Sequence, residues 1–430
     1  MIRRLATCRN SSMKIRAAAK NNLSSVKQVS SGLPRDARPS TREPEYEKAP
    51  PDQRIDAPCE PIYPPEAGHT FDTGNTLKFG ARSEFLSVLH QRVDDHFSTT
   101  GRPRRDCLQM YVKTVIIFSW FVTSYAMLVF VAATWWQALP LAISLGLAMA
   151  AIGFNIQHDG GHQAYSNYSG INKLTALTLD LLGGSSYVWD RKHNSIHHTY
   201  ANITGYDDDI NIGFLGRLSP HQKRLKFHRF QHFYLWILYG VMAVKWQVYD
   251  DFRDILRGRI DGHVFVRPRG WTLTVFIVGK LVFFSMALVI PMLLCEARAV
   301  LLCYVVATFV QGVTLSVVFQ LAHCVEDADF PLPNSVTGRI ENAWAVHQVE
   351  TTVDFASQNR LVAWFTGGLN FQIEHHLFPR ICHVNYPVIS KLVEETCREF
   401  GIKYVAHETF FAGVASHFRW LRRMGMSDAE

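Results

Sequence analysis

Histidine is concentrated in three short stretches of this sequence, each just beyond an apolar run. The stretches read HDGGH at 158–162, HNSIHH at 193–198 and QIEHH at 372–376. With one more histidine at the end of a further apolar run, the set is His158, His162, His193, His197, His198, His323, His375 and His376. Residues three or four apart lie near one face of an α-helix, so each stretch aims two or three imidazoles at one point. Neutral imidazole binds iron, zinc or copper, and eight such ligands are too many for one ion. The pattern therefore predicts two metals.

Four apolar segments are long enough to hold these histidines at a membrane. They are 114–133, 138–156, 272–294 and 299–322, and Lys280 is the single charge within them. A membrane-spanning helix needs about 20 mostly apolar residues. We therefore expect an all-α integral membrane protein with four transmembrane helices in two hairpins and a helical cap that holds the metals. Buried helices of a soluble protein are the alternative, but such helices rarely run this long without charge.

Hairpin topology places all the histidines on one side of the membrane. The turns near 134–137 and 295–298 carry only Glu296 and Arg298 as charges, whereas basic residues such as Arg102, Arg104 and Arg105 lie on the histidine side. The positive-inside rule then puts the cap in the cytosol or in the stroma or matrix of an organelle. The net charge of +7 suits a cap against anionic lipid and gives no reason to expect nucleic acid.

The N-terminal region differs from the rest of the chain. Basic residues precede the first acid, Asp36, with many Ser and Ala between them, which is typical of a transit peptide. Residues 1–50 are thus predicted to be a transit peptide, favouring a plastid membrane, or else a disordered basic tail on a protein of the endoplasmic reticulum. Residues 51–105 are predicted to form a linker and an amphipathic helix at 71–97. The membrane domain is expected at 106–403, and a C-terminal tail at 404–430.

Two further apolar stretches are too short or too interrupted to span. Residues 174–188 are expected to lie along the interface, and 221–259 to form one or two interfacial amphipathic helices. A fifth span at 230–248 would separate the second and third histidine stretches across the membrane, so it is rejected. Lys280 is expected either to snorkel or to face the protein interior. The eight cysteines contain no CxxC pair and are expected to be reduced and without function.

Several polar residues near these stretches allow more than one role. Gly160 and Gly161 are expected to let another helix approach closely. Asp207, Asp208 and Asp209 fit either hydrogen bonds to ligand histidines or a solvated turn or helix cap. His347 is a weaker candidate for a metal ligand or a hydrogen-bond donor. The histidines of the amphipathic stretch are expected to be interfacial rather than metal-bound; they are His221, His228 and His232.

Zinc hydrolysis is the natural rival interpretation of histidine pairs at a membrane. A zincin needs HExxH, with Glu as the general base, and this string is absent. Zinc takes three or four ligands and would leave about half of the histidines unused. A metal transporter would place ligands within its spans, whereas these lie at or beyond the helix ends.

The three histidine stretches and their flanks resemble the membrane-bound fatty acid desaturases. The resemblance runs from about residue 106 to 403 and includes Trp344, HQVETT at 347–352 and GGLNFQIEHHLFP at 367–379. It implies a non-haem di-iron centre, with the eight histidines named above, His323 included, as the ligands. Gln372 stands where many members of the family have His. It could coordinate directly, bind through water or orient a neighbour.

Gln at the start of the third stretch is similar to the front-end desaturases, which add a double bond between an existing one and the carboxyl end. The implied reaction is O2-dependent removal of two hydrogens from adjacent methylenes of a lipid- or CoA-linked acyl chain. The HPGG motif of a fused cytochrome b5 is absent from the sequence, so a separate donor is expected, ferredoxin or free cytochrome b5. A hydroxylase, epoxygenase or acetylenase would share the site, and a zinc-dependent lipid hydrolase or a metal-binding sensor is the more distant alternative.

Overall fold

Four long apolar helices dominate the computed structural model, which describes residues 77–260 and 262–426. They run over Leu108–Val131, Trp135–Gly161, Gly270–Leu294 and Ala297–His323, and each is long and apolar enough to cross a membrane. The four predicted spans are therefore confirmed; each begins two to six residues earlier than predicted, and the first also ends two residues earlier. Within the described part of the chain, 230–248 forms no fifth helix of this kind.

Three of the four spans change helix type along their length. The first is α2 (Leu108–Ala126) followed by the π-helix η1 (Met127–Val131), and the fourth is the unbroken α14 (Ala297–His323). The second comprises α3 (Trp135–Ile152), the π-helix η2 (Gly153–Gln157) and α4 (His158–Gly161), and the third comprises α12 (Gly270–Phe284), the π-helix η8 (Ser285–Val289) and α13 (Ile290–Leu294). A π-helix accommodates an additional residue in a turn and is frequent at functional sites.

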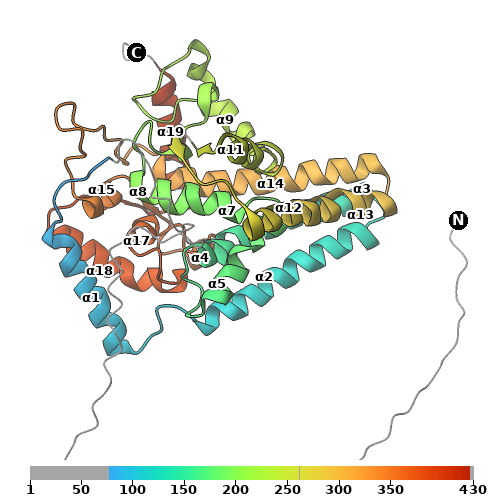
Figure 1. Cartoon of the computed structure of the whole chain (residues 1–430), viewed down its shortest axis with the longest axis horizontal. Helices are drawn as coiled ribbons and strands as arrows, with labels where there is room; N and C mark the ends of the chain where they lie inside the picture. The colour runs from blue at the N-terminus through green and yellow to red at the C-terminus, as the bar shows by residue number, and fades with distance from the viewer. Residues whose placement is uncertain (1–76, 261, 427–430) are drawn as a thin grey trace, which may run out of the picture. The chain divides into compact units, whose positions relative to one another are not determined.

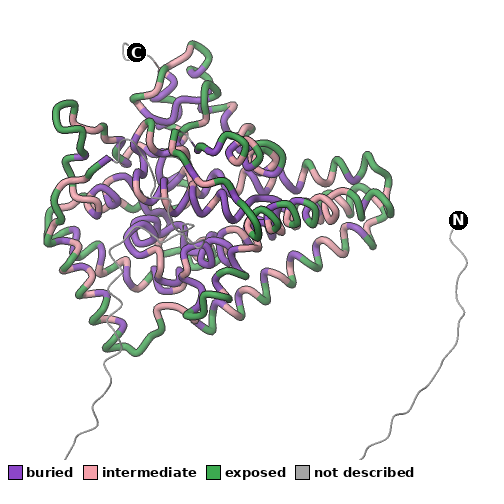
Figure 2. The backbone as a smooth tube through the Cα atoms, viewed as in Figure 1, coloured by how far each residue is buried: buried purple, intermediate pink, exposed green. Residues whose placement is uncertain are grey.

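The second and fourth spans form the centre of the helix group. Within the most apolar 18 residues of each span, 61% are buried in the protein for the second span and 39% for the fourth, against 22% and 17% for the first and third. The α3 and α14 helices approach closely at Gly146, where an added Cβ would lie 2.3 Å from the carbonyl oxygen of Ala307. Short turns join the spans in pairs, so all four reach the cap at the same end, while their far ends are largely exposed (Figures 1 and 2).

The cap consists of short elements from every other part of the described chain. Before and between the spans lie α1 (Glu84–Thr100), α5 (Ser169–Ala176), α6 (Thr178–Leu181), α7 (Ser186–Trp189), the π-helix η3 (Asp190–His197), α8 (His198–Tyr200), the 3-10 helices η4 (Asp208–Ile210), η5 (Gly213–Leu215) and η6 (Lys226–Phe230), α9 (Gln231–Tyr239), α10 (Met242–Lys245), the π-helix η7 (Trp246–Asp250), α11 (Asp251–Arg257), and an antiparallel pair of β1 (Arg259–Ile260) and β2 (His263–Val264). After the fourth span come α15 (Trp344–Glu350), β3 (Asp354–Phe355), α16 (Arg360–Phe365), α17 (Gln372–Leu377), the 3-10 helix η9 (His383–Asn385), α18 (Tyr386–Glu399), β4 (Ala406–His407), parallel to β3, and α19 (Phe410–Gly425).

Segments at the edge of the cap match the sequence predictions in part. The helix α9 exposes Phe233 and Ile237, and α11 exposes Leu256, as expected of interfacial helices. Residues 174–188, in contrast, are mostly buried in protein instead of lying along the interface, because α6 packs against α12 and η2. The predicted helix at 71–97 begins only at Glu84, since the chain at Lys78 is extended and pairs with Arg339; its residues 71–76 lie outside the described residues.

Lys280 faces the protein interior rather than snorkelling. Its Nζ donates to the carbonyl oxygens of Gly183 (2.7 Å), Gln247 (3.1 Å) and Trp246 (3.3 Å) and to Oδ2 of Asp251 (2.7 Å). These partners belong to the loop before α7, to η7 and to α11. A buried ammonium needs such partners because the low-dielectric interior cannot solvate it. The lysine therefore fastens the third span to the cap. In the part of the chain that the structure describes, the cysteines are all free, as expected.

Candidate metal centre

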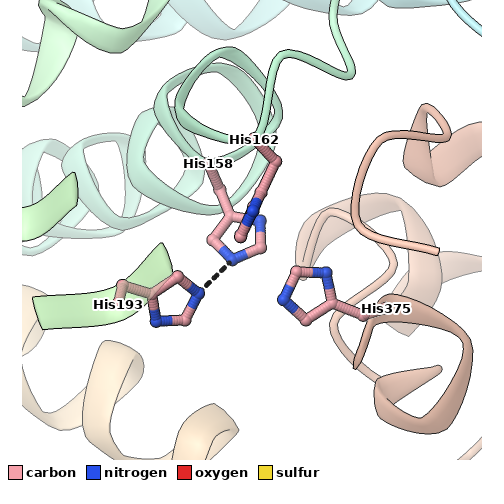
Figure 3. A group of neighbouring side chains, drawn as sticks. All are labelled: His158, His162, His193 and His375. Carbon is pink, nitrogen blue, oxygen red and sulfur yellow. Dashed lines mark hydrogen bonds between the residues drawn. The ribbon is translucent and has the colours of Figure 1, made fainter. Parts of the chain in front are cut away.

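Four of the eight predicted histidines form one compact group. His158 is the first residue of α4 and His162 follows its end, while His193 comes from η3 and His375 from α17. One ring nitrogen from each lies within 4.8 Å of those of the other three, and all four side chains are buried. Figure 3 shows the four rings turned toward a common centre, with His158 Nε2 and His193 Nε2 3.2 Å apart.

The remaining four histidines extend this group into a second one. Nitrogens of His197, His323 and His376 satisfy the same 4.8 Å limit and are buried. His198 lies between the two groups: it joins His375 and His376 in a third set, and its Nε2 is 3.3 Å from Nε2 of His193. The structure therefore brings together every histidine that the sequence singled out, as two adjoining clusters.

Close packing of α4 against its neighbours depends on glycine, as expected from the sequence. A Cβ on Gly160 would lie 2.3 Å from Oγ1 of Thr175, and one on Gly161 would lie 2.2 Å from the ring of Trp189. Neither contact is tolerable for a real Cβ. The two glycines thus allow α5 and α7 to approach α4, and α7 leads directly into η3, which carries the second histidine stretch.

Local hydrogen bonds hold these elements in register. Asn194 on η3 donates from Nδ2 to the carbonyl oxygen of Gly161 (2.9 Å) and to Oδ1 of Asp190 (2.7 Å). Asn202 donates from Nδ2 to the carbonyl oxygen of His323 at 3.0 Å. The bond from Asn194 to Gly161 connects the second histidine stretch to the first. The bond from Asn202 to His323 connects the turn that follows the second stretch to the end of α14.

Burial keeps four ligand candidates outside the spans in their neutral form. Desolvation, with a smaller contribution from neighbouring imidazoles, lowers the pKa of His193, His198, His375 and His376 well below its usual value near 6.5. A neutral imidazole retains one lone pair, which is what a metal ion requires. These four imidazoles are therefore in the ligating state at neutral pH.

Partners on the outer nitrogens direct the inner nitrogens toward the clusters. His376 Nδ1 lies 2.7 Å from Oε1 of Gln348, and His375 Nδ1 lies 3.3 Å from the hydroxyl of Tyr386. His197 Nδ1 lies 3.2 Å from both carboxylate oxygens of Asp207. A metal-bound histidine commonly donates its other N–H to such a group, which fixes the ring and its tautomer.

The inner nitrogens fit metal ions. Nε2 of His197, His375 and His376 are buried and have no hydrogen-bond partner. A buried polar atom left in that state costs about 1–3 kcal/mol, so three together in one place indicate a missing ligand. Imidazole donors without thiolate suit iron, zinc or copper, and two adjoining clusters suit two ions.

The aspartate run 207–209 performs both of the roles considered for it. Asp207 accepts from the backbone N–H of Asp209 and so caps η4, while it also binds His197. Burial lowers the pKa of His197, but Asp207 and Asp209 more than offset that effect and raise it overall. Asp208 instead pairs with Lys192, at 2.5 Å.

Of the other residues considered from the sequence, Gln372 contacts a cluster, whereas the remaining histidines belong to none of the metal-ligating sets in the described residues. Gln372 begins α17, and its Nε2 is 3.0 Å from Nε2 of His323, so it contacts the second cluster. His347 belongs to none of the metal-ligating sets in the described residues; its ring lies 5.1 Å from that of Phe79. His221 and His228 lie near carbonyl oxygens of Phe330 and Phe214. His232, on α9, is likewise absent from those sets.

Sequence reasoning missed most of the residues that support the ligands. Gln348 stood within a quoted motif, but nothing local marked it as a partner of His376. Behind α17, the Tyr404 hydroxyl donates to Asp354 at 2.8 Å and to Glu374 at 3.2 Å. Asp354 in turn accepts from the backbone N–H of Ile373 at 3.0 Å. A second set of contacts supports the first histidine stretch: Asp159, next to His158, pairs with His383 (2.9 Å), and His383 contacts Lys113 (2.9 Å).

Two cavities lie below the clusters. A small one of about 30 Å³, the upper cavity, is lined by His158, Trp189, Gln247, Gln311 and Phe319 among others. A larger one of about 480 Å³, the lower cavity, lies between the spans and is lined mainly by apolar side chains, with Tyr125, Met149, Tyr304 and Thr308 among them. The small cavity thus adjoins the first cluster, and the larger cavity provides apolar space between the spans that is large enough for a hydrocarbon chain.

Comparison with known proteins agrees with this arrangement. Residues 133–408 match the family model described as fatty acid desaturase. The chain belongs to the fatty acid desaturase family. It is 37% identical to the sn-1 linoleoyl-lipid 6-desaturases of Arthrospira platensis and of Synechocystis sp., over 83% and 82% of this chain and 96% and 99% of theirs. It is also 34% identical to the acyl-lipid (8-3)-desaturase of Physcomitrium patens, over 85% of this chain and 77% of that one.

Family membership identifies this fatty acid desaturase as an oxidoreductase of lipid metabolism that acts on fatty acyl chains. With its four apolar helices, it is an integral membrane protein. Its buried histidine clusters have the donor atoms that could hold a metal ion. The match places the chain among desaturases and not among the lipid hydrolases considered above.

Proposed function

We propose that this protein is a front-end acyl-lipid desaturase with a di-iron centre. In this assignment His158, His162, His193 and His375 hold one iron, His197, His323 and His376 hold the other, and His198 completes the set between them. The observation that carries the proposal is the convergence of eight buried imidazoles, several with an outer nitrogen held by another side chain.

Regiochemistry is proposed from two sources. Gln372 at the start of the third stretch is the residue typical of front-end enzymes, and it contacts the second cluster. Several similar proteins also have names that specify desaturation near the carboxyl end of lipid-linked chains, such as linoleoyl-lipid 6-desaturase. We therefore propose a glycerolipid-linked, already unsaturated acyl chain as the substrate. Gln372 is proposed to orient or supplement the ligands of the second iron.

In this proposal the residues of the protein hold the metal ligands and the substrate in place. Bound iron would supply the oxidising power that takes hydrogen from an unactivated methylene, using O2 and two electrons. The protein holds the ligand rings through Gln348, Asp207 and Tyr386, and apolar walls exclude water from the site. The reacting part of the acyl chain is proposed to lie at the upper cavity, against His158, where two adjacent methylenes can be held in a fixed geometry.

Electron supply and location complete the proposal. We propose a separate acidic donor, ferredoxin or cytochrome b5, which would approach the exposed basic residues where η6 meets α19; they are Lys223, Lys226, Arg229, Arg422 and Arg423. A plastid membrane, with the clusters on the stromal side, is favoured by the basic composition of residues 1–50, a segment outside the described residues. The endoplasmic reticulum with a cytosolic cap is the alternative.

Product analysis tests the reaction. Yeast that express the chain are fed linoleic and α-linolenic acids, and the double bonds in their fatty acid methyl esters are located by mass spectrometry. A new cis double bond on the carboxyl side of the existing ones is expected. A hydroxylated product, or a new bond on the methyl side, would contradict the proposal. A parallel plastid host that supplies ferredoxin covers a donor mismatch.

Metal analysis tests the centre independently of activity. The protein is purified in detergent, and its metals are measured by inductively coupled plasma mass spectrometry. About two irons per chain are expected, and chelation should remove iron and activity together. Stoichiometric zinc without iron would refute the di-iron assignment.

A further inference from the structure

The upper cavity is too small for the substrate that the proposed function requires. Its volume of about 30 Å³ leaves room for about two water molecules. Wherever the new double bond forms, the part of the acyl chain on its methyl side must lie somewhere apolar. The lower cavity is the nearest such space: Met149, in its lining, is nine residues from His158 along the second span, or roughly 13 Å.

The lower cavity has the dimensions of an acyl tail. Its lining on the second span runs from Trp135 to Met149, about 21 Å of helix. One acyl chain occupies about half of a bilayer core of about 30 Å, so this length is sufficient for an acyl tail. The polar carrier of the chain stays in the aqueous cap or headgroup zone, so the methyl end is the end that points into this space.

A partition separates the two cavities. It consists of Leu182, Gly183, Gln247, Phe283 and Tyr304 (called the partition below). Leu182 and Gln247 line the upper cavity, whereas Phe283 and Tyr304 line the lower one. The Tyr304 hydroxyl donates to Oε1 of Gln247 at 2.8 Å, and Nε2 of Gln247 donates to the carbonyl oxygen of Leu182 at 3.2 Å.

The partition is tightly packed and anchored. A Cβ on Gly183 would lie 2.6 Å from the ring of Phe283 and 2.8 Å from Cγ of Gln247. The Nζ of Lys280 binds the backbone of the partition by donating to the carbonyl oxygens of Gly183 and Gln247. Since the backbone is fixed, the side chains of Gln247 and Tyr304 are the parts that can separate.

Two polar side chains are unexpected on a route between apolar cavities. Gln311 adds a third: it is buried, lines the upper cavity, and its Oε1 has no hydrogen-bond partner. When the hydrogen bond between Gln247 and Tyr304 opens, both side chains face hydrocarbon, and a saturated chain has no group that can accept a hydrogen bond from them. A cis double bond presents a π cloud, which accepts weak hydrogen bonds from N–H and O–H donors.

We propose that the methyl-side part of the acyl chain passes between Gln247 and Tyr304 into the lower cavity, and that these two side chains select a chain already unsaturated at that point. The inference rests on the proposed function. It gives a physical reason for a front-end enzyme to prefer linoleic over oleic chains. Both carry a cis double bond at carbon 9, but only linoleic acid carries a second one at carbon 12, and this bond, further toward the methyl end, is the one that would lie at the partition.

Two variants and one control test the proposal in yeast supplied with oleic or linoleic acid. Q247L/Y304F makes the partition apolar while nearly conserving its size. Thr308→Phe introduces a ring into the lining of the lower cavity, one helical turn from Tyr304 on α14. Thr274→Phe introduces the same ring on the exposed face of α12, away from both cavities. The measurements are the amount of carboxyl-side double bond formed from each acid and the iron bound by each purified protein.

The wild type should prefer linoleic over oleic chains. Q247L/Y304F should lower that preference by about five-fold, since two weak contacts are lost. T308F should form no product from either acid, with iron content equal to that of T274F, which should remain active. An unchanged preference in Q247L/Y304F, or equal product from T308F and T274F, would overturn the proposal. If the wild type forms no carboxyl-side bond, the proposed function itself fails, and this inference with it.

Discussion

Replacing Lys280 by methionine tests whether the third span is fastened to the cap in the way the structure shows. Methionine fills a similar volume but donates no hydrogen bond. It would leave the carbonyl oxygens of Gly183 and Gln247 and the carboxyl group of Asp251 without their donor. The side chains of Lys280 and Asp251 are only 7% and 8% exposed, so water cannot easily replace the ammonium.

The expected loss of stability is large. Breaking a buried ion pair by removing one partner costs about 3–5 kcal/mol. Burial already raises the pKa of Asp251 to about 6, so this carboxyl should become protonated in the variant, and the cost should fall at the lower end of that range. At about 2–4 °C per kcal/mol, the midpoint of thermal unfolding should drop by about 5–10 °C.

Fluorescence-detected size-exclusion chromatography after heating measures this midpoint in detergent. K245M is the matched control, because Lys245 is half exposed where it pairs with Asp250, and an exposed pair contributes about 0–1 kcal/mol. The double variant K280M/D251L should recover about half of the loss, since it removes the unpaired carboxyl but not the unpaired carbonyls. A midpoint of K280M equal to that of K245M would refute the reasoning.

Three more predictions concern the metal site and its surroundings. H375A should abolish desaturation and lower bound iron, because His375 belongs to the first cluster and adjoins the second; surviving activity would contradict its assignment as a ligand. Q348L should lower activity or iron affinity by about 10- to 100-fold through the lost partner of His376 Nδ1, and wild-type values for both would contradict that role. Burial raises the pKa of Asp180 to about 7, whereas an unfolded Asp titrates near 3.9. The folded state therefore binds more protons between these values, and stability falls as pH rises through that window. D180N should accordingly raise the unfolding midpoint more at pH 8 than at pH 5, and equal shifts at both would contradict the assignment.

The spans and the histidines could be predicted because each has a local signal. An uncharged apolar run marks a span wherever it occurs, and three histidine stretches together are hard to explain as packing. Hairpin topology then placed the stretches at one end. The domain boundaries at residues 50, 105 and 403 were predicted only from composition and from the family resemblance, and they remain predictions.

Partners distant in sequence could not be predicted in the same way. Lys280 was ambiguous because its acceptors come from residues 183, 246, 247 and 251, and no local pattern shows that these converge. Gln348 and Tyr386 support ligands on another helix, which depends on how α15, α17 and α18 pack. Residues 174–188 looked interfacial because they are apolar and short, but apolar composition does not distinguish a lipid neighbour from a protein one.

The π-helix η2, immediately before His158, bears on how such a site tolerates insertions and deletions. A π-turn holds one residue more than the α-turn it replaces. Deleting a single residue from Gly153–Gln157 would restore an ordinary α-helix of nearly the same length, so the span would still cross the membrane. Because the π-turn and the α-turn that replaces it each complete one turn, the residues after the deletion would keep nearly the same direction relative to α3. His158 and His162 would therefore still face the other ligands, whereas deleting one residue from α3 itself would rotate them by about 100°. The second span can thus lose a residue at this turn without losing the metal site, and natural variants of this chain should change length there or in their loops but not within α3.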